Sequence, residues 1–434
     1  MDATPNIDAA ADQPAEPDQP DKRSFLAMLG PGLVTGAADD DPSGIATYSQ
    51  VGAQFGYGLS WTLLFSFPLM AVIQSVSARI GCVTGCGIAQ NLRRHYPAPL
   101  LWVVVSLLIV ANVVNLGADL GAMGAALHLL VGGPELAYTM LFGLACALLE
   151  ILVSYNRYAG ILKWTTLSLF AYVAVAFAAG VPWGTALYHT FVPQIVLDGQ
   201  HAMAIVAILG TTISPYLFFW QAGQEVEEQR RRHVKPLCVA PRQAGDELAR
   251  IRTDTILGMG VSNLIALFIV FAAAATLNAK GVTDIQTSAQ AAEALRPVAG
   301  DAAFFLFAAG IVGTGMLAVP VLAGSVAYAV SEMFRWKEGL NRRPRQAKAF
   351  YAVIAATTLA GVGLNFMSVD PIKALYWSAV VNGVLAAPLM AIMMLIAVNR
   401  QIMGRLTLSP AMIMGGWMAT IAMAAATVAF AVAD

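Results

Sequence analysis

Apolar stretches of about 20 residues or more follow one another along almost the whole chain after residue 25. A helix of that length crosses the hydrocarbon core of a bilayer, and it satisfies its backbone hydrogen bonds internally, as lipid requires. Charged residues make up only 12% of the chain, against about 25% in a typical soluble protein. The sequence therefore predicts an all-α polytopic membrane protein. It argues against a soluble enzyme, a nucleic-acid-binding protein and a secreted disulfide scaffold.

The basic residues predict how the helices are oriented. With the N-terminus in the cytoplasm, 22 of the 25 Lys and Arg residues fall on the cytoplasmic side. This positive-inside bias supports a multi-pass protein of the cell (inner) membrane with an extracytoplasmic C-terminus. Residues 1–23 contain six acidic residues and four prolines, which predicts a disordered acidic cytoplasmic tail. Eleven membrane-spanning helices are expected, at residues 26–56, 59–79, 98–129, 135–154, 160–180, 200–230, 255–278, 301–331, 349–368, 371–398 and 410–431.

Two of the expected helices contain residues that interrupt a helix. The first carries three aspartates and a proline within residues 37–44, and the sixth carries small polar residues and a proline within residues 210–216. A proline inside a helix removes a hydrogen bond, and a carboxylate in lipid costs at least about 2.5 kcal/mol. Each interruption lies in the first helix of a five-helix group, which predicts inverted repeats at 24–180 and 200–398 and an eleventh helix at 410–432. Such paired interruptions are typical of a transporter's midplane binding site.

Oxygen atoms at these two interruptions suit a hard divalent cation. Asp41 is the candidate direct ligand, and the freed carbonyl of Thr211 and the hydroxyl of Ser214 are its candidate partners. Asp39 and Asp40 cannot share a helix face with Asp41 at about 100° per residue, so we expect them to cap a helix, relay protons or line the vestibule. Carboxylate, carbonyl, hydroxyl and water oxygens favour Mg²⁺, Mn²⁺ or Ca²⁺ over Cu⁺ or Zn²⁺. The cation is expected as a transported substrate, and no cofactor is expected.

Other acidic residues are expected to lie along a pathway or at the membrane surface. Asp119 stands in a small and apolar stretch, where an acid is by default functional. Glu150 is expected at an interfacial helix end, and Glu227 is expected to be solvated. Three residues follow the second interruption at spacings of four and three and share one face, which points either to the cytoplasmic exit or to solvent: Gln221, Glu225 and Glu228.

The two interruptions resemble the metal-binding segments of the NRAMP divalent metal transporters. Asp-Pro-Ser-Gly at residues 41–44, after Gly-Pro-Gly at residues 30–32, is similar to the first-helix motif Asp-Pro-Gly-Asn of that family. Residues 210–216 are similar to its sixth-helix segment, which contains Met-Pro-His. The resemblance covers nearly the whole chain after the tail. It implies a LeuT-like fold and metal transport by alternating access.

Several positions differ from the family pattern. Gly44 replaces the motif asparagine, which the resemblance implies is a metal ligand. Ser214 replaces the family methionine, which removes a sulfur ligand and with it the preference for softer metals. Tyr216 replaces the histidine that follows the proline. These differences are similar to those of divergent NRAMP-related proteins, some of which are magnesium-permeable, and so imply Mg²⁺ or Mn²⁺.

Two further helices bear on coupling and on the ligand set. The acidic pair of the family's third helix becomes Leu116 and Asp119, and Asn382 or Ser378 could stand where its tenth helix has a glutamine. The missing histidine and acid weaken the case for proton coupling. An amino-acid or organic-solute symporter on the same scaffold is the alternative function, although three adjacent aspartates would repel a carboxylate substrate. A sensor or scaffold without transport activity is a third hypothesis.

Overall fold

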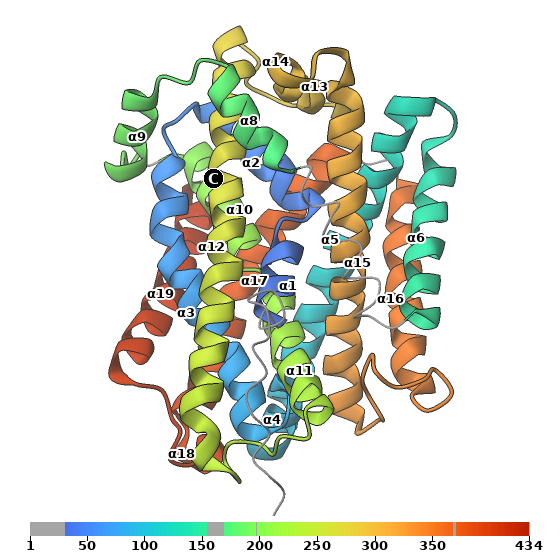
Figure 1. The fold of residues 1–434 in the computed structure, drawn as a ribbon, viewed down its shortest axis with the longest axis vertical. Helices are drawn as coiled ribbons and strands as arrows, with labels where there is room; N and C mark the ends of the chain where they lie inside the picture. Colours follow the sequence, from blue (N-terminus) through green and yellow to red (C-terminus); the bar gives the residue numbers. More distant parts are fainter. Residues whose placement is uncertain (1–30, 154–168, 197, 368–369, 434) are drawn as a thin grey trace, which may run out of the picture.

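The computed structural model describes residues 31–153, 169–196, 198–367 and 370–433, and within them the chain is helical (Figure 1). The expected tail at 1–23 and residues 160–168 of the expected fifth span lie outside these ranges. In chain order, the helices are α1 (Pro31–Asp39), α2 (Pro42–Phe55), α3 (Ser60–Thr84), α4 (Ile88–His95), α5 (Ala98–Val131), α6 (Glu135–Leu152), α8 (Phe170–Ala178), α9 (Trp183–Phe191), α10 (Gly199–Thr212), α11 (Pro215–Arg231), α12 (Ala244–Thr276), α13 (Ser288–Ala292), α14 (Arg296–Ala299), α15 (Ala303–Phe334), α16 (Lys348–Leu364), α17 (Pro371–Val398), α18 (Arg400–Met403) and α19 (Pro410–Ala433).

The span count agrees with the sequence where the two can be compared. Among the residues described, nine helical segments are long and apolar enough to cross a membrane, with α10 and α11 counted together. The expected first span is divided between α1 and α2, and α8 covers the end of the expected fifth span. The short helices α4 and α9 and the α13–α14 segment lie between the long ones and were not expected, because their residues lack a long apolar run.

Both expected interruptions are present. α1 ends at Asp39 and α2 begins at Pro42, whose missing N–H is harmless at the first position of a helix. Asp41 caps α2, since its Oδ1 accepts a hydrogen bond of 2.7 Å from the amide of Gly44. The local sequence therefore ends one helix and starts the next within two residues.

The second interruption is stabilised by its own serine. α10 ends at Thr212 and α11 begins at Pro215. The hydroxyl of Ser214 lies 2.9 Å from the carbonyl oxygens of both Gly210 and Thr211 and can donate to either. Carbonyls at a helix end have no partner within the helix, so this side chain stabilises the end of α10.

The long helices form two packed groups around these interruptions (Figure 1). α5, α6, α15 and α16 pack on one another, and α1, α2, α3, α11 and α12 form the second group. α10 packs on α17, and α19 packs on α3, α10 and α17. The corresponding helices α3 and α12, α5 and α15, and α6 and α16 of the two predicted repeats thus lie in the same group. The inverted relation between the repeats stays a prediction.

Glycine allows the closest approach at two of these helix crossings. A Cβ atom on Gly36 of α1 would lie 2.4 Å from the carbonyl oxygen of Gly258 in α12, and one on Gly210 of α10 would lie 2.0 Å from that of Ala379 in α17. Real Cβ contacts essentially never fall below 3.0 Å, so a larger residue would separate the helices. Small residues at helix crossings are a general means of packing in membranes. Here they position both interrupted helices.

Gly210→Ala is expected to destabilise the protein by about 1–3 kcal/mol, because the added methyl group overpacks the α10–α17 crossing. The melting temperature of the detergent-purified protein measures this loss. Gly363→Ala in α16 is the matched control, since a Cβ atom there would meet nothing within 4 Å. Equal melting temperatures for the two variants would contradict the packing argument.

Candidate metal site at the helix interruptions

The buried Asp41 carboxylate lies where the interrupted helices meet α5. Its Oδ1 accepts from the amide of Gly44, and its Oδ2 lies 3.0 Å from Nδ2 of Asn115 in α5. The hydroxyl of Tyr216, in the first turn of α11, lies 3.3 Å from the same Oδ2 and 3.1 Å from the carbonyl oxygen of Ala38. One carboxylate therefore connects α2, α5 and α11. Asn115 was not predicted as a site residue, although it stands one turn before Asp119 in the same apolar helix.

α17 reaches the site through Ser378. The Ser378 hydroxyl lies 2.8 Å from Oδ1 of Asn115 and 3.2 Å from the hydroxyl of Ser43. Ser43 in turn donates to the carbonyl oxygen of Leu375 at 3.2 Å. Ser378 and Asn382 were the two candidates to replace the family's tenth-helix glutamine. Of these, Ser378 contacts Asn115, which is a hydrogen-bond partner of Asp41. Asn382 is buried one turn further along, and its Oδ1 makes no hydrogen bond with any described residue.

One side chain of the second interruption lies near the first, whereas the expected ligand atoms, the Thr211 carbonyl and the Ser214 hydroxyl, contact each other. A Cβ atom on Gly44 would lie 3.2 Å from Oγ1 of Thr211, so the bare glycine lets α10 approach α2. The structure therefore gathers Asp41, Gly44, Thr211 and Ser214 around the interruptions, and Gly44 contributes its amide to Asp41. Among the described residues, no group of three or more His, Cys, Asp or Glu side chains could hold a metal. A cation here would depend on one carboxylate with neutral oxygens.

The other two aspartates of the triplet face α12. Oγ of Ser262 lies 2.7 Å from Oδ2 of Asp39 and 3.0 Å from Oδ1 of Asp40. Both carboxylates are buried, so neither lines an open vestibule in this structure. Their shared partner on α12 differs from the partners of Asp41 on α5 and α11.

Two more acids are buried among the helices of the α5–α6–α15–α16 group. Asp119 in α5 is fully buried, and neither of its carboxylate oxygens makes a hydrogen bond within the described part of the chain. Glu150 was expected at the membrane surface, and that prediction was wrong, because its side chain is only 3% exposed. A Cβ atom on Gly324 of α15 would lie 3.4 Å from its Oε1. The packing of α6 on α5, α15 and α16 covers Glu150, and the sequence of α6 alone does not reveal this packing.

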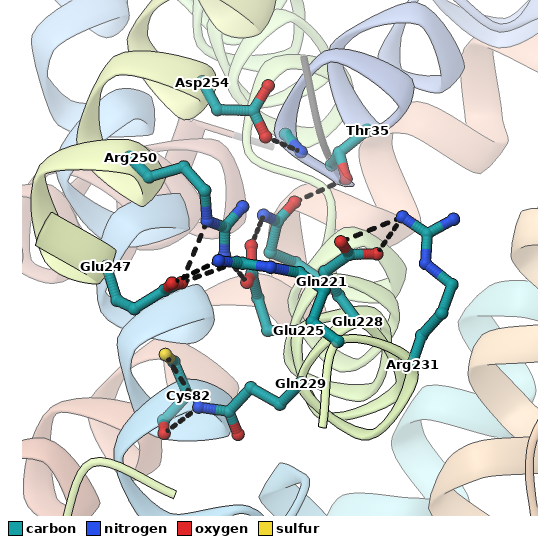
Figure 2. Close-up of polar contacts among 12 residues, drawn as sticks. Thr35, Cys82, Gln221, Glu225, Glu228, Gln229, Arg231, Glu247, Arg250 and Asp254 are labelled. Carbon is teal, nitrogen blue, oxygen red and sulfur yellow. Dashed lines mark hydrogen bonds and ion pairs between the residues drawn. The ribbon is translucent and has the colours of Figure 1, made fainter. Parts of the chain in front are cut away.

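A polar network joins α1, α11 and α12 near Arg231 and Arg250, at what we call the arginine-rich end of the molecule (Figure 2). Thr35 of α1 donates to Gln221 of α11, whose Nε2 lies 3.4 Å from Oε1 of Glu225. The buried Glu225 forms an ion pair of 2.6 Å with Arg250 of α12, and Arg250 also contacts Glu247 at 3.1 Å. These contacts join α1 to α11 and α11 to α12.

The predicted face of α11 is divided between this network and the surface. Gln221 and Glu225 belong to the network, which agrees with a face turned into the helix bundle. Glu228 pairs with Arg231 at 2.6 Å near the surface. A further contact fixes α1, since the amide of Gly32 donates to Oδ2 of Asp254 at 2.7 Å.

Glu227 was expected to be solvated, and that prediction was wrong. It is 5% exposed, accepts from the hydroxyl of Tyr328 in α15, and accepts from the amide of Leu340 at 2.7 Å. The loop after α15 folds back over α11 and covers it. In the same loop, Glu338 lies 3.8 Å from Arg230, and burial raises the pKa of Glu338 to about 7 although Arg230 opposes the shift.

A cavity of about 400 Å³ lies on the opposite side of Asp41, between α2, α10 and α17. Ala46 and Ile372 line it, one helical turn from Ser43 and Leu375 respectively. The Ser43–Leu375 hydrogen bond thus lies between the cavity and Asp41. The cavity therefore ends about one helical turn short of the buried candidate site.

Comparisons with known proteins agree with this architecture. The Nramp family model, described as natural resistance-associated macrophage protein-like, matches residues 32–433. The chain is 27% identical over 413 residues to the divalent metal cation transporter MntH of Deinococcus radiodurans, with 92% of this chain and 88% of the relative covered. It is 29% identical over 396 residues to MntH of Burkholderia ambifaria, with coverage of 88% and 83%.

Solved structures share the fold. The manganese transporter of Eremococcus coleocola superposes with a TM-score of 0.77 at 15% identity, covering 95% of this chain and 89% of that one. Mhp1, a nucleobase-cation-symport-1 family transporter in a closed conformation, gives a TM-score of 0.53 at 15% identity, with coverage of 93% and 92%. An all-helical, multi-span membrane transporter fold is thereby confirmed.

Glu338→Gln is expected to flatten the pH dependence of stability. A carboxyl whose pKa rises from 4.5 to about 7 on folding binds its proton more tightly in the folded state. Its stabilising effect is therefore present below pH 4.5 and is lost as the pH rises through 7. The melting temperature of the wild type should fall over this window, and less so in the variant. Glu228→Gln, which removes the surface pair with Arg231, is the control and should keep the wild-type slope; an unchanged slope in Glu338→Gln would contradict the assignment.

Proposed function

This chain belongs to the Nramp family, and on that premise we propose that it carries a divalent metal cation, Mg²⁺ or Mn²⁺, across the membrane by alternating access. The observation that carries the proposal is the position of Asp41. This buried carboxylate lies at the meeting point of two interrupted helices, and the hydrogen bonds it receives from the described part of the chain come from neutral donors. A single negative charge surrounded by neutral dipoles favours a cation as its ligand.

The chemistry of the surrounding atoms supports a hard cation. The hydroxyl of Tyr216 reaches both Asp41 and the carbonyl of Ala38, and the carbonyl of Thr211 and the hydroxyl of Ser214 lie at the second interruption. All of these groups are oxygen ligands and none is a sulfur ligand, so they give softer metals no advantage. One carboxylate with a few neutral oxygens replaces only part of a hydration shell, which suits an ion such as Mg²⁺ that retains several waters. The divalent metal cation transporter and the manganese transporter that this chain resembles support the same class of substrate.

The closed and open sides support alternating access. The Thr35–Gln221 and Glu225–Arg250 contacts close the arginine-rich side, and the cavity above Ser43 approaches from the other side. In the proposed cycle, the group that contains α1, α2, α3, α11 and α12 tilts against the α5–α6–α15–α16 group. The tilt breaks the contacts on the arginine-rich side and closes the cavity on the other side. We place the arginine-rich end in the cytoplasm, where basic loops accumulate. This puts the cation's entry outside the cell.

Proton coupling is expected to be weak or absent in the proposed cycle. Tyr216 and Leu116 stand where the resemblance places a histidine and one of two acids. Only Asp119 remains of that set, buried one turn from Asn115. Metal flux into proteoliposomes with an entrapped pH dye would show the coupling directly, as acidification that accompanies or fails to accompany the metal.

Asp41→Ala is expected to abolish metal binding and uptake, because it removes the carboxylate at the meeting point of α2, α5 and α11. Isothermal titration of Mg²⁺, Mn²⁺ and Ca²⁺ into the purified protein measures binding, and proteoliposome flux measures uptake. Asp246→Ala, at an exposed aspartate in the first turn of α12, is the matched control and should behave as the wild type. Unchanged uptake by Asp41→Ala, or metal-independent uptake of a radiolabelled amino acid, would refute the metal assignment.

Ser214→Met is expected to shift selectivity from Mg²⁺ toward Mn²⁺ and Cd²⁺, since a thioether is a soft ligand. The ratio of Cd²⁺ to Mg²⁺ needed to inhibit Mn²⁺ uptake by half measures the shift. Ser214→Ala removes the hydroxyl without adding sulfur and separates the two effects. An equal change of selectivity in both variants would show that the sulfur is not responsible.

A further inference from the structure

An apolar groove of about 700 Å³ lies between α3, α12 and α19 on the arginine-rich half of the molecule. Phe67 and Val72 of α3, Ile256 of α12 and Met412 of α19 are among the side chains that line it. The three helices lie together on one flank in Figure 1, away from the α6–α16 flank. The candidate metal site does not include any of these residues. The groove is therefore a separate feature of the fold.

Two arginines line the end of this groove. Arg252 of α12 is exposed, and no carboxylate pairs with it among the described residues. Arg79 of α3 donates to the carbonyl oxygens of Leu406 and Thr407, at 3.1 and 3.0 Å, and likewise has no carboxylate partner in the described part of the chain. The end of the groove therefore carries two positive charges that the described protein does not neutralise.

The length of the groove matches one leaflet of a bilayer. Phe67 and Arg79 are 12 positions apart in α3, which corresponds to about 18 Å along the helix axis. Half of the hydrocarbon core is about 15 Å thick. A groove with apolar walls at the bilayer centre and guanidinium groups at headgroup level has the polarity of a phospholipid.

We propose that this groove binds one anionic phospholipid, with an acyl chain against Phe67 and Val72 and the phosphate near Arg79 and Arg252. Guanidinium groups form strong charge-assisted hydrogen bonds with phosphate, and basic pockets between transmembrane helices bind anionic headgroups. The lipid fills the seam between α19 and the helices α3 and α12, and so stabilises their contact.

The competing occupant is the acidic segment at residues 1–23. Its six carboxylates could pair with the arginines, but it has no run of apolar residues to cover the groove walls. The apolar lining therefore favours a lipid over this segment. Because the full chain is used in the test, a groove already filled by the segment would show no response to lipid.

Lipid titrations of the full-length protein in neutral detergent test the proposal. Phosphatidylglycerol should raise the melting temperature more than phosphatidylcholine with the same acyl chains, and glycerophosphoglycerol, the headgroup without chains, should have little effect. Arg252→Ala should weaken the apparent affinity for phosphatidylglycerol about tenfold, the effect of about one lost charge-assisted hydrogen bond. Arg345→Ala removes an equally exposed arginine from the loop before α16 and should leave the affinity unchanged.

A second variant tests the apolar wall. Ala411→Trp places a large ring in the groove from the exposed start of α19 without a change of charge, and it should also weaken phosphatidylglycerol binding. Metal titration of the same variants should match the wild type, which separates this proposal from the function proposed above. Equal responses to the two lipids, equal loss in Arg252→Ala and Arg345→Ala, a full response to glycerophosphoglycerol, or a wild type insensitive to lipid would each overturn it.

Discussion

The hydrogen bonds of the Asp41 carboxylate are the interaction on which the centre of this structure depends. A charged group within a membrane-spanning helix is costly unless other groups solvate it. The chain meets this cost by ending α1 and starting α2 at Asp41, so that the carboxylate caps a helix and faces the positive end of its dipole. Asn115 and Tyr216 supply the remaining donors from two other helices. The interruption and the candidate site are thus one structural feature.

In the proposed cycle, the same hydrogen bonds couple binding of the cation to movement of the helices. A cation that binds Oδ2 of Asp41 competes with the donors from Asn115 and Tyr216, which belong to α5 and α11. Its arrival would loosen the contacts of α2 with α5 and α11 at once. The closure on the arginine-rich side, through Glu225 and Arg250, is a separate set of contacts that must open next. Close glycine crossings keep α1 and α10 seated on α12 and α17 while this occurs.

Much of the fold and the centre of the site could be predicted from the sequence, and the errors have a common cause. Long apolar runs, prolines and the triplet of aspartates act within a few residues, so both interruptions and the spans within the described residues were correctly located, with Asp41 at the first interruption. Asn115 was missed, and Glu150 and Glu227 were wrongly placed at the surface. Each of these depends on residues from another helix, such as Asn115 pairing with Asp41 across 74 positions.

The sequence by itself determined that this chain spans a membrane, where its helices break, and that a carboxylate stands at the first break, because hydrophobicity and helix-breaking residues act locally. The tertiary structure alone decided which side chains surround that carboxylate. It brought Ser378 to Ser43 across 335 positions, turned Asp39 and Asp40 toward Ser262, and folded a loop over Glu227. Burial and hydrogen bonding of a polar side chain depend on its neighbours in space, and helix packing, which local sequence does not encode, selects those neighbours.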